Sequence, residues 1–530
     1  MASKEQQGTW RSRLFYHLDG LAMCGVVPVL DLSGLLEEVL QEGGDVDELA
    51  AAHRANAGYL NVGLRMLCSQ GMVTATRAED RVAYHPVRSG DVAQWAMHRE
   101  AYALGREWME AMVGSWNHPG RPLAGGVGEM AKRFLALRAA WHAQGVMPAG
   151  LPANLTERLA LHVEGAMMAP LLVTLGTAYG TEPMRTEQNL AQALGKLHPS
   201  KVDLWWSLSD ALGWSGTEEG AFFLERAAVY GVTTSYTQTF LWAKELLLGD
   251  GRWLWRTEPG EPEIHVDRTL NVWGSGGAHK AYFSHLDEVV KRVFNQPLES
   301  QPKGICDMGC GNGALLLHLN DVVRNQTLRG AHLDSHPLML VGADFNQEAL
   351  VATADHFMHK GVAGHFLWGD IGDPDQLALD LYELHHVRLG DLMNVRSFLD
   401  HNRVYNVPVF ERPDVPRTTG AYSFRGERLR LRDVEQSLKE HLMKWAPYVA
   451  QHGLLMIELH TVDPADARAL QGKLPATAYD ATHGYSDQYI VEIPVFDAMA
   501  EEAGLHMETE VSRTFPSSLP ATVSLRFFRA

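Results

Sequence analysis

The chain has 530 residues, of which 46% are apolar and 21% charged, and a formal net charge of −18. Because a single hydrophobic core stops growing near about 250–300 residues, we expect two or three domains. No stretch approaches the roughly 18–20 uncharged apolar residues of a membrane span, and the composition is that of a globular protein. The acidic charge opposes binding to nucleic acids, because phosphate contacts need clustered Lys and Arg. We therefore expect neither membrane nor nucleic acid as a partner.

The N-terminus and the cysteines indicate a reducing compartment. Residues 1–7 are polar, and no apolar segment follows a basic start, so we expect no secretory signal and a cytoplasmic location. Four scattered cysteines argue against a disulfide framework: Cys24, Cys68, Cys306 and Cys310. The last two lie inside a glycine motif, and we interpret them as small packing residues rather than metal ligands.

Residues 1–94 show the order of a winged-helix domain. Ser33 is a candidate N-cap for a helix carrying Leu35, Leu36, Val39 and Leu40. A second helix is expected near Asp45, and a third carries Leu60, Leu64 and Leu67. Met72 to Tyr84, interrupted by polar residues 77–80, predicts a two-stranded wing. Given the acidic charge, such a domain favours dimerisation over DNA binding.

Residues 95–301 are predicted to be mostly helical, and they hold eleven of the fourteen tryptophans. These aromatic residues either form a core or belong to a helical lid that lines a substrate pocket. Near its end, Asn271–His279 predicts a glycine turn that either folds over a cofactor or links two domains.

Residues 302–530 alternate short apolar strands with helices, as a doubly wound parallel sheet does. A last antiparallel pair is expected at Gln488–Ile493 and Val523–Phe528. The fold class is thus α/β, a seven-stranded Rossmann-like domain preceded by the winged-helix-like domain and the helical lid. The other strands are expected at 304–308, 339–343, 363–368, 392–396 and 454–459.

A glycine motif, Asp307-x-Gly309-x-Gly311-x-Gly313, stands between the first of these strands and a helical run. Such a loop lets the backbone approach a ligand closely, although dinucleotide-binding folds share it. The acid before the first glycine resembles the methyltransferase pattern, in which it contacts the methionine end of S-adenosylmethionine (SAM).

Two further acids follow the next two strands. Asp344 ends one of them, where a carboxylate can accept both ribose hydroxyls. Asp370 ends the other and is a candidate for the adenine amino group, with Ile371 packing on the ring. Each acid alone could merely cap a helix, but three at successive strand ends favour a cofactor site.

The next two strand ends should carry the chemistry, because ligands lie beyond the carboxyl ends of parallel strands. Arg396 is a candidate for a substrate carboxylate, while Asp400 and Arg403 form either part of the site or a structural salt bridge. His460 follows the fifth strand and is a candidate general base, structural histidine or metal ligand.

Four segments together resemble the metal-dependent C-methyltransferases of polyketide synthase loading modules, the apratoxin type. They are Val272–His279, Asp307–Gly311, Arg396–Arg403 and His483–Gln488. The resemblance implies SAM, a mononuclear Fe or Mn ion held by Asp433, His460 and Gln488, and methylation of the alpha carbon of malonyl or methylmalonyl units on acyl carrier protein. Other polyketide synthase domains are implied as partners. The family often carries a decarboxylating acyltransferase-like domain after the methyltransferase, which we do not expect before Ala530.

The implied mechanism is that the metal stabilises an enolate, whose carbon attacks the methyl group. His483 or Tyr485 would take the alpha proton, and the sequence does not choose between them. The alternative is a metal-independent O-methyltransferase acting on a small molecule, with His460 as base. The number of methyl transfers, the native metal, any decarboxylation and the oligomeric state are left open by the sequence.

Overall fold

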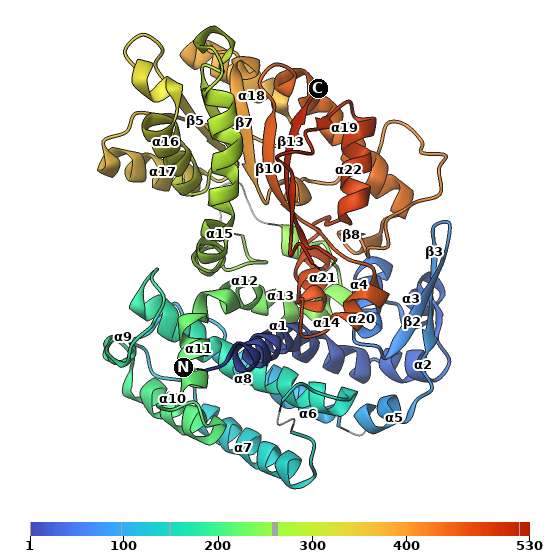
Figure 1. Ribbon diagram of the computed structural model, residues 1–530. Coiled ribbons are helices and arrows are strands. Elements are labelled where there is room, and N and C mark those ends of the chain that lie inside the picture. Colours follow the sequence, from blue (N-terminus) through green and yellow to red (C-terminus); the bar gives the residue numbers. More distant parts are fainter. Residues whose placement is uncertain (1, 97, 148–149, 257–262, 519) are drawn as a thin grey trace. The chain divides into compact units, whose positions relative to one another are not determined.

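The structure is a computed structural model that describes residues 2–96, 98–147, 150–256, 263–518 and 520–530. The chain folds into two compact units (Figure 1). Unit 1 contains residues 1–278, 421–428 and 463–486, and unit 2 contains residues 279–420, 429–462 and 487–530. The predicted segment 1–94 belongs to unit 1, and the predicted segment 95–301 is divided, with residues 95–278 in unit 1 and 279–301 in unit 2. The domain boundaries stay predictions.

Unit 1 contains the predicted winged-helix order. Strands β2 and β3 pair antiparallel from Val73↔Pro86 to Ala78↔Arg81, which confirms the wing. Asp45 caps the second predicted helix, because its carboxylate accepts from the backbone N–H groups of Asp47 and Glu48. The elements are α2 (Leu35–Gln41), β1 (Gly44–Asp45), α3 (Val46–His53), α4 (Ala57–Ser69), β2 (Val73–Ala78) and β3 (Arg81–Pro86).

The prediction for Ser33 was wrong. A single helix, α1 (Lys4–Leu32), precedes it, and the Ser33 hydroxyl donates to the Leu30 carbonyl at the end of that helix. The N-cap of α2 is Gly34, whose φ of +80° suits the sharp turn between the two helices.

The described residues of unit 1 between the wing and residue 278 are mostly helical, as predicted. Two of its helices, α1 and α8, are long and apolar enough for a membrane span, but their apolar windows are 89% and 100% buried in the structure, as in core helices. The helices after the wing are α5 (Gly90–Ala96), α6 (Glu100–Met112), α7 (Val127–Ala143), α8 (Leu155–Tyr179), α9 (Glu187–Leu194), α10 (Pro199–Leu212), α11 (Glu218–Glu225), α12 (Gly231–Ser235), α13 (Thr237–Leu241) and α14 (Ala243–Leu248).

The glycine turn predicted at Asn271–His279 lies within a helix, α15 (Arg268–Phe294), so this prediction was wrong. Glycine serves close packing there, since a Cβ on Gly274 would come within 2.7 Å of the Gly231 backbone in α12. Trp273, one residue earlier, donates its indole N–H to the Gly180 carbonyl at 2.8 Å. The side chains of 277–281 lie outside the described residues.

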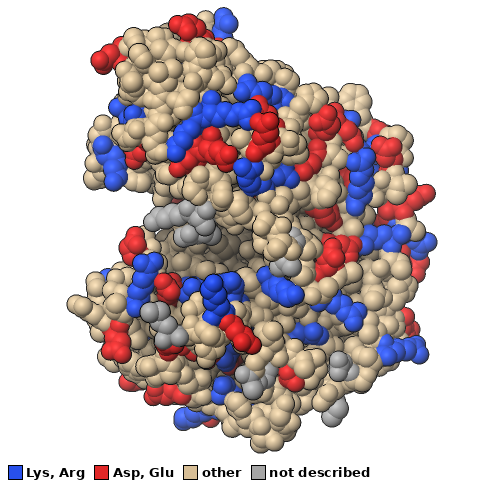
Figure 2. Space-filling view, in the orientation of Figure 1, with Lys and Arg blue, Asp and Glu red and all other residues tan. Residues whose placement is uncertain are grey.

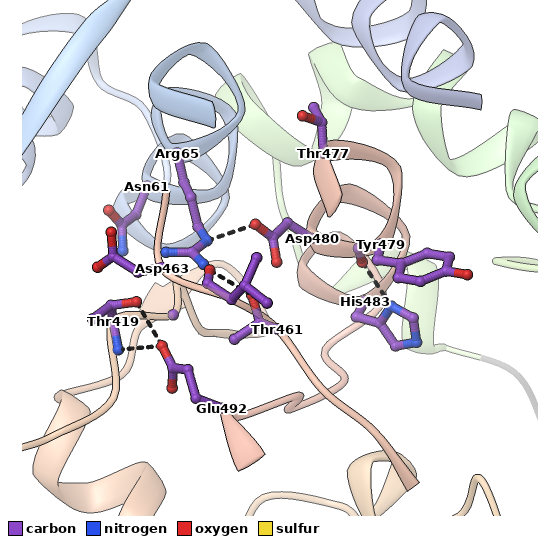
Figure 3. A network of polar contacts seen from close by, with 12 residues as sticks. Asn61, Arg65, Thr419, Thr461, Asp463, Thr477, Tyr479, Asp480, His483 and Glu492 are labelled. Atoms are coloured by element: carbon purple, nitrogen blue, oxygen red, sulfur yellow. Dashed lines mark hydrogen bonds and ion pairs between the residues drawn. The ribbon is translucent and has the colours of Figure 1, made fainter. Parts of the chain in front are cut away.

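Later chain segments also fold into unit 1. They are β8 (Ser423–Phe424), β9 (Glu427–Arg428), α20 (Pro464–Ala469) and α21 (Ala476–Gly484). A buried ion pair joins α21 to α4, with Arg65 Nε 2.8 Å from an Asp480 carboxylate oxygen (Figure 3).

Unit 2 is built on a mixed sheet in the order β11-β13-β10-β7-β4-β5-β6, with β12 paired to β13. The five strands from β10 to β6 run parallel, β13 pairs antiparallel with β10, and β11 and β12 each pair antiparallel with β13, which confirms the predicted α/β fold. The strands are β4 (Gly304–Met308), β5 (Met339–Asp344), β6 (His365–Trp368), β7 (Leu392–Ser397), β10 (Leu454–Leu459), β11 (His506–Met507), β12 (Arg513–Phe515) and β13 (Val523–Arg529).

Helices cover both faces of this sheet. Neighbouring residues of a strand point to opposite faces, so they pack in different cores. Ile305 packs in a core with α16 and the second half of α15, and Cys306 packs in another core with α18 and Trp445 of α19. The helices of unit 2 are α16 (Ala314–Gln326), α17 (Gln347–Lys360), α18 (Pro374–His385), α19 (Leu431–Val449) and α22 (Ile493–Glu502).

The strand predicted at Gln488–Ile493 is absent. Residues 487–492 form no regular element, and Ile493 begins α22 with Pro494 in its first turn. Proline favours the first turn of a helix and cannot donate to a sheet. The antiparallel partners of β13 are instead β10, β11 and β12.

Charges of both signs are interspersed on the face of the molecule shown in Figure 2.

Candidate functional site

The glycine loop after β4 has a backbone that only glycine adopts easily. Gly309, Gly311 and Gly313 have φ values of +77°, +56° and +73°. A Cβ on Gly309 would come within 2.9 Å of Leu399, and one on Gly313 within 2.8 Å of Thr353. The loop therefore combines left-handed backbone with tight packing directly before α16.

Asp307, at the end of β4, has an unsatisfied carboxyl group. It is 1% exposed, and its Oδ1 has no hydrogen-bond partner among the described residues. Burial, and then the nearby Asp344 carboxylate, raises the pKa of Asp307 to about 8. A buried carboxyl without a partner is costly unless a ligand satisfies it, and the ammonium group of SAM is a ligand of the right charge.

Asp344 is fixed at the end of β5 by the glycine loop itself. Its Oδ2 accepts from the Gly311 backbone N–H at 2.9 Å, and its Oδ1 accepts from that of Asn346, also at 2.9 Å. The loop and this acid thus form one hydrogen-bonded unit.

Two exposed aromatic residues beside Asp344 were missed by the sequence reasoning. Phe345 is 65% exposed and Trp368, at the end of β6, is 44% exposed, with ring centroids 5.4 Å apart. The signal was available, because large aromatic side chains directly follow or end two predicted strands.

Asp370 and Ile371 follow β6. Asp370 Oδ1 accepts from the Gly372 backbone N–H at 2.7 Å, and the Ile371 carbonyl accepts from the Trp445 indole at 2.8 Å. Because β4, β5 and β6 are adjacent and parallel, the predicted cofactor residues share one edge of the sheet. The glycine loop and the unsatisfied Asp307 fit SAM. The contacts of Asp344, Asp370 and Ile371 with the cofactor stay predictions.

Arg396, at the end of β7, is turned into the protein. It is 1% exposed; its Nη1 lies 2.6 Å from Asp400 Oδ1, and its guanidinium carbon lies 3.9 Å from the ring centroid of Trp445. Asp400 therefore belongs to a buried salt bridge with Arg396, and the Arg403 Nη1 donates to the Asp400 carbonyl. A role for Arg396 in binding a substrate carboxylate stays a prediction.

A histidine–glutamate pair at the ends of β7 and β10 was also missed. His401 Nδ1 lies 2.5 Å from Glu458 Oε1, and Glu458 Oε2 accepts from the Asp400 backbone N–H at 2.8 Å. The hydrogen bond from Nδ1 leaves the lone pair of the ring on Nε2. One signal was present in the sequence: Glu458 is a single charged residue in the apolar strand Leu454–Leu459.

His460 is completely buried after β10. Its Nδ1 lies 3.0 Å from the Val491 carbonyl, and its Nε2 lies 2.7 Å from the Ser524 hydroxyl. Burial lowers the pKa of His460 to about 3, so the ring is neutral, donating to Val491 and accepting from Ser524.

The predicted metal ligands do not form a ready cation site in this conformation. Asp433, in the first turn of α19, pairs with Arg430 through both oxygens at 2.7 and 3.0 Å, and both His460 nitrogens have protein partners. Gln488 is 8% exposed in the segment before α22. Within the part of the chain that the structure describes, no three His, Cys, Asp or Glu residues form a metal cluster. We therefore assign no chemical step to a metal.

The two candidate proton acceptors, His483 and Tyr485, belong to unit 1. His483 Nδ1 lies 2.6 Å from the Tyr479 carbonyl (Figure 3), and Tyr485 stacks on Tyr59 in the core. Burial raises the pKa of Tyr485 well above its ordinary value, which disfavours the phenolate. Their catalytic roles stay predictions.

Three family models match the chain, and their descriptions name one protein type. They are the AprA N-terminal domain at residues 10–75, the AprA winged helix domain at 164–250, and the AprA MT2-like domain at 263–526. The winged-helix match falls in a helical part of unit 1, whereas the helices and wing predicted within 1–94 overlap the N-terminal match. No curated protein matches the chain significantly in sequence.

Several solved structures are similar, at low identity. The CurJ carbon methyltransferase is 10% identical over 99% of this chain and 92% of its own, with a TM-score of 0.37. The DszA carbon methyltransferase is 10% identical over 83% and 93%, with a TM-score of 0.31. An O-methyltransferase family 2 protein from Planctomyces limnophilus is 11% identical over 100% and 97%, with a TM-score of 0.37. All these scores are below 0.5, so the assignment rests on the family models.

The Asp307 carboxyl predicts a pH-dependent affinity for S-adenosylhomocysteine (SAH). With its pKa raised to about 8, Asp307 must lose a proton before it can pair with the ligand's ammonium group. Affinity should therefore rise with pH between 6 and 7.5, by up to about tenfold per unit. Calorimetry in buffers of different ionisation enthalpy should detect the released proton.

Asp307→Asn should remove this pH dependence and weaken binding at pH 7.5. Asp321→Asn, at an exposed position on α16, is the matched control and should behave as wild type. A slope that persists in Asp307→Asn would contradict the assignment.

The glycine loop predicts unequal effects for two alanine substitutions at similar backbone angles. Gly313 and Gly361 have φ values of +73° and +64°, but a Cβ would clash only at Gly313. Gly361→Ala should lower the free energy of unfolding by about 1 kcal/mol and leave SAH affinity unchanged. Gly313→Ala should also weaken SAH binding by at least about tenfold, since the loop must shift. Equal SAH affinities of the two variants would argue against a role for this loop.

Proposed function

The chain belongs to the AprA family of SAM-dependent methyltransferases, and from this we propose that it methylates the alpha carbon of a malonyl or methylmalonyl unit on acyl carrier protein. The reaction would serve the biosynthesis of a polyketide starter unit, beside other polyketide synthase domains. The observation that carries the proposal is the His401–Glu458 pair, because removal of an alpha proton needs an oriented base.

Different strand ends hold the methyl donor and the base in this proposal. Asp307 and the glycine loop follow β4, while His401 and Glu458 lie at the ends of β7 and β10, on the same edge of the sheet. A donor and a base on one edge can act on opposite sides of a single carbon atom. This arrangement supports methyl transfer coupled to proton removal.

In the proposed reaction, the alpha proton passes to His401 Nε2. Glu458, bonded to Nδ1, stabilises the imidazolium that forms, as the carboxylate of a catalytic triad does. The alpha carbon then bonds to the methyl group of SAM, the sulfur–methyl bond breaks, and SAH leaves. These residues require no proton acceptor from unit 1.

The activity follows from incubating malonyl- and methylmalonyl-loaded carrier protein with SAM and measuring the mass of the acyl unit. We expect a gain of one methyl group, with kcat reduced about 10²–10⁴-fold in His401→Ala. Glu458→Gln should also reduce kcat, because the amide cannot stabilise the imidazolium.

His359→Ala, at an exposed position on α17, is the control and should retain full activity. Methylation of phenols or hydroxyls, with no mass gain on either carrier substrate, would establish the O-methyltransferase alternative. His401→Ala with unchanged kcat would exclude this histidine as the base.

Metal content tests the ligand set that the resemblance implies. If Asp433, His460 and Gln488 hold Fe or Mn, purified protein should contain about one equivalent, because nitrogen and oxygen donors suit these ions. His460→Asn should lose it, while the matched variant His359→Asn should keep it. A metal-free protein whose activity resists chelators would remove the metal and leave the methyltransferase assignment intact.

A further inference from the structure

A chain of buried contacts within unit 2 connects the predicted adenine contact with the His401–Glu458 pair. Trp445 of α19 donates its indole N–H to the Ile371 carbonyl at 2.8 Å. The Arg396 guanidinium carbon lies 3.9 Å from the centroid of the Trp445 ring, and Arg396 Nη1 lies 2.6 Å from Asp400 Oδ1. None of these three side chains is more than 1% exposed.

The buried position of Arg396 costs folding free energy. Burial lowers the pKa of its guanidinium, and its Nε and Nη2 have no hydrogen-bond acceptor among the described residues. Asp400, the face of Trp445 and the nearby Glu458 carboxylate compensate the buried charge. Apolar residues of similar volume often replace a buried ion pair without loss of stability. Stability alone therefore gives no reason for an arginine at this position.

Asp400 joins Arg396 to the base. Its carboxylate also lies 2.9 Å from His441 Nε2, and its backbone N–H donates to Glu458 Oε2 at 2.8 Å. The next residue, His401, bonds through its ring to the other oxygen of Glu458. A shift of the Asp400 side chain would therefore move the backbone that carries the imidazole.

We propose that Trp445, Arg396 and Asp400 are positioning residues that couple cofactor binding at the Ile371 loop to the orientation of the His401–Glu458 pair. The two sites are joined by successive contacts. A ligand that moves Ile371 would shift the carbonyl that accepts from the Trp445 indole, and Arg396 packs on the face of that indole. This inference rests on the proposed function, since it takes His401 as the base. In this proposal Arg396 positions the base through Asp400 and does not bind a substrate carboxylate.

The first test uses Trp445→Phe, which keeps a ring under Arg396 and removes the N–H that reaches Ile371. Tyr448→Phe is the matched control, because it lies three residues further on the same helix and loses one hydrogen bond, to Asp375. SAH affinity is measured by calorimetry. The imidazole N–H signal of His401 is followed by NMR with ¹⁵N-labelled histidine and is identified by its loss in His401→Asn.

We expect SAH to shift the His401 signal in the wild type. Trp445→Phe should weaken SAH binding about three- to tenfold and reduce that shift by at least half, and Tyr448→Phe should match the wild type in both readouts. An unchanged His401 signal on adding SAH to the wild type, or equal behaviour of the two variants, would overturn the proposal. Neither readout needs an acyl substrate, so they can fail or succeed independently of the proposed reaction.

The second test separates positioning from substrate binding. Arg396→Lys keeps the charge but not the planar group, and should lower kcat at least tenfold while leaving the KM for the carrier-bound acyl unit within about twofold. Asp400→Asn should lower kcat similarly, and thermal unfolding checks that each variant folds. If Asp400→Asn does not fold, Arg396→Lys carries the test. A KM raised at least tenfold in Arg396→Lys, with kcat unchanged, would show that Arg396 binds the substrate and overturn the proposal.

Discussion

The arrangement of residues at the carboxyl ends of β7 and β10 depends on one buried carboxylate, Glu458. It is 2% exposed and accepts from four N–H groups, which are those of the Asp400, His401 and Leu459 backbones and the His401 ring. Burying an ionised carboxylate is costly unless donors surround it, so the chain after β7 must curl back over the end of β10. Phe398, at this curl, has a φ of +54°, a strained angle that the hydrogen bonds around it maintain.

Asp307 and Glu458 are two buried carboxyl groups on one sheet edge that differ in their hydrogen-bond partners. Glu458 is saturated with donors, whereas one oxygen of Asp307 has no partner among the described residues and its pKa is raised to about 8. The saturated group suits the orientation of a histidine ring. The unsatisfied group suits a ligand that brings its own positive charge. The two carboxyl groups therefore differ in their hydrogen-bond partners, and this difference underlies the separate roles that we propose for them.

The sequence predicted the parts of unit 2 that local patterns determine. The glycine motif, five parallel strands and the acids at their ends follow from periodicity and from the rule that parallel strands share an edge. The His401–Glu458 pair was missed because its members are 57 residues apart and meet only through the pairing of β7 with β10. Asn271–His279 was taken for a turn because of its glycines, but the segment is helical and Gly274 serves close helix packing. Pro494 was the overlooked signal against a strand at Gln488–Ile493.

The path of the chain explains why neighbours in the sequence are poor guides to neighbours in the site here. Residues 421–428 and 463–486 interrupt unit 2 and fold into unit 1, and they follow the loops after β7 and β10. His483 and Gln488, predicted together from one short motif, consequently belong to different units. Arg65 and Asp480 hold the helix of His483 within unit 1, whereas Gln488 begins the return to the sheet. A site built from unit 2 alone draws on strand-end residues such as His401 and Glu458, and a role for His483 or Tyr485 stays a prediction.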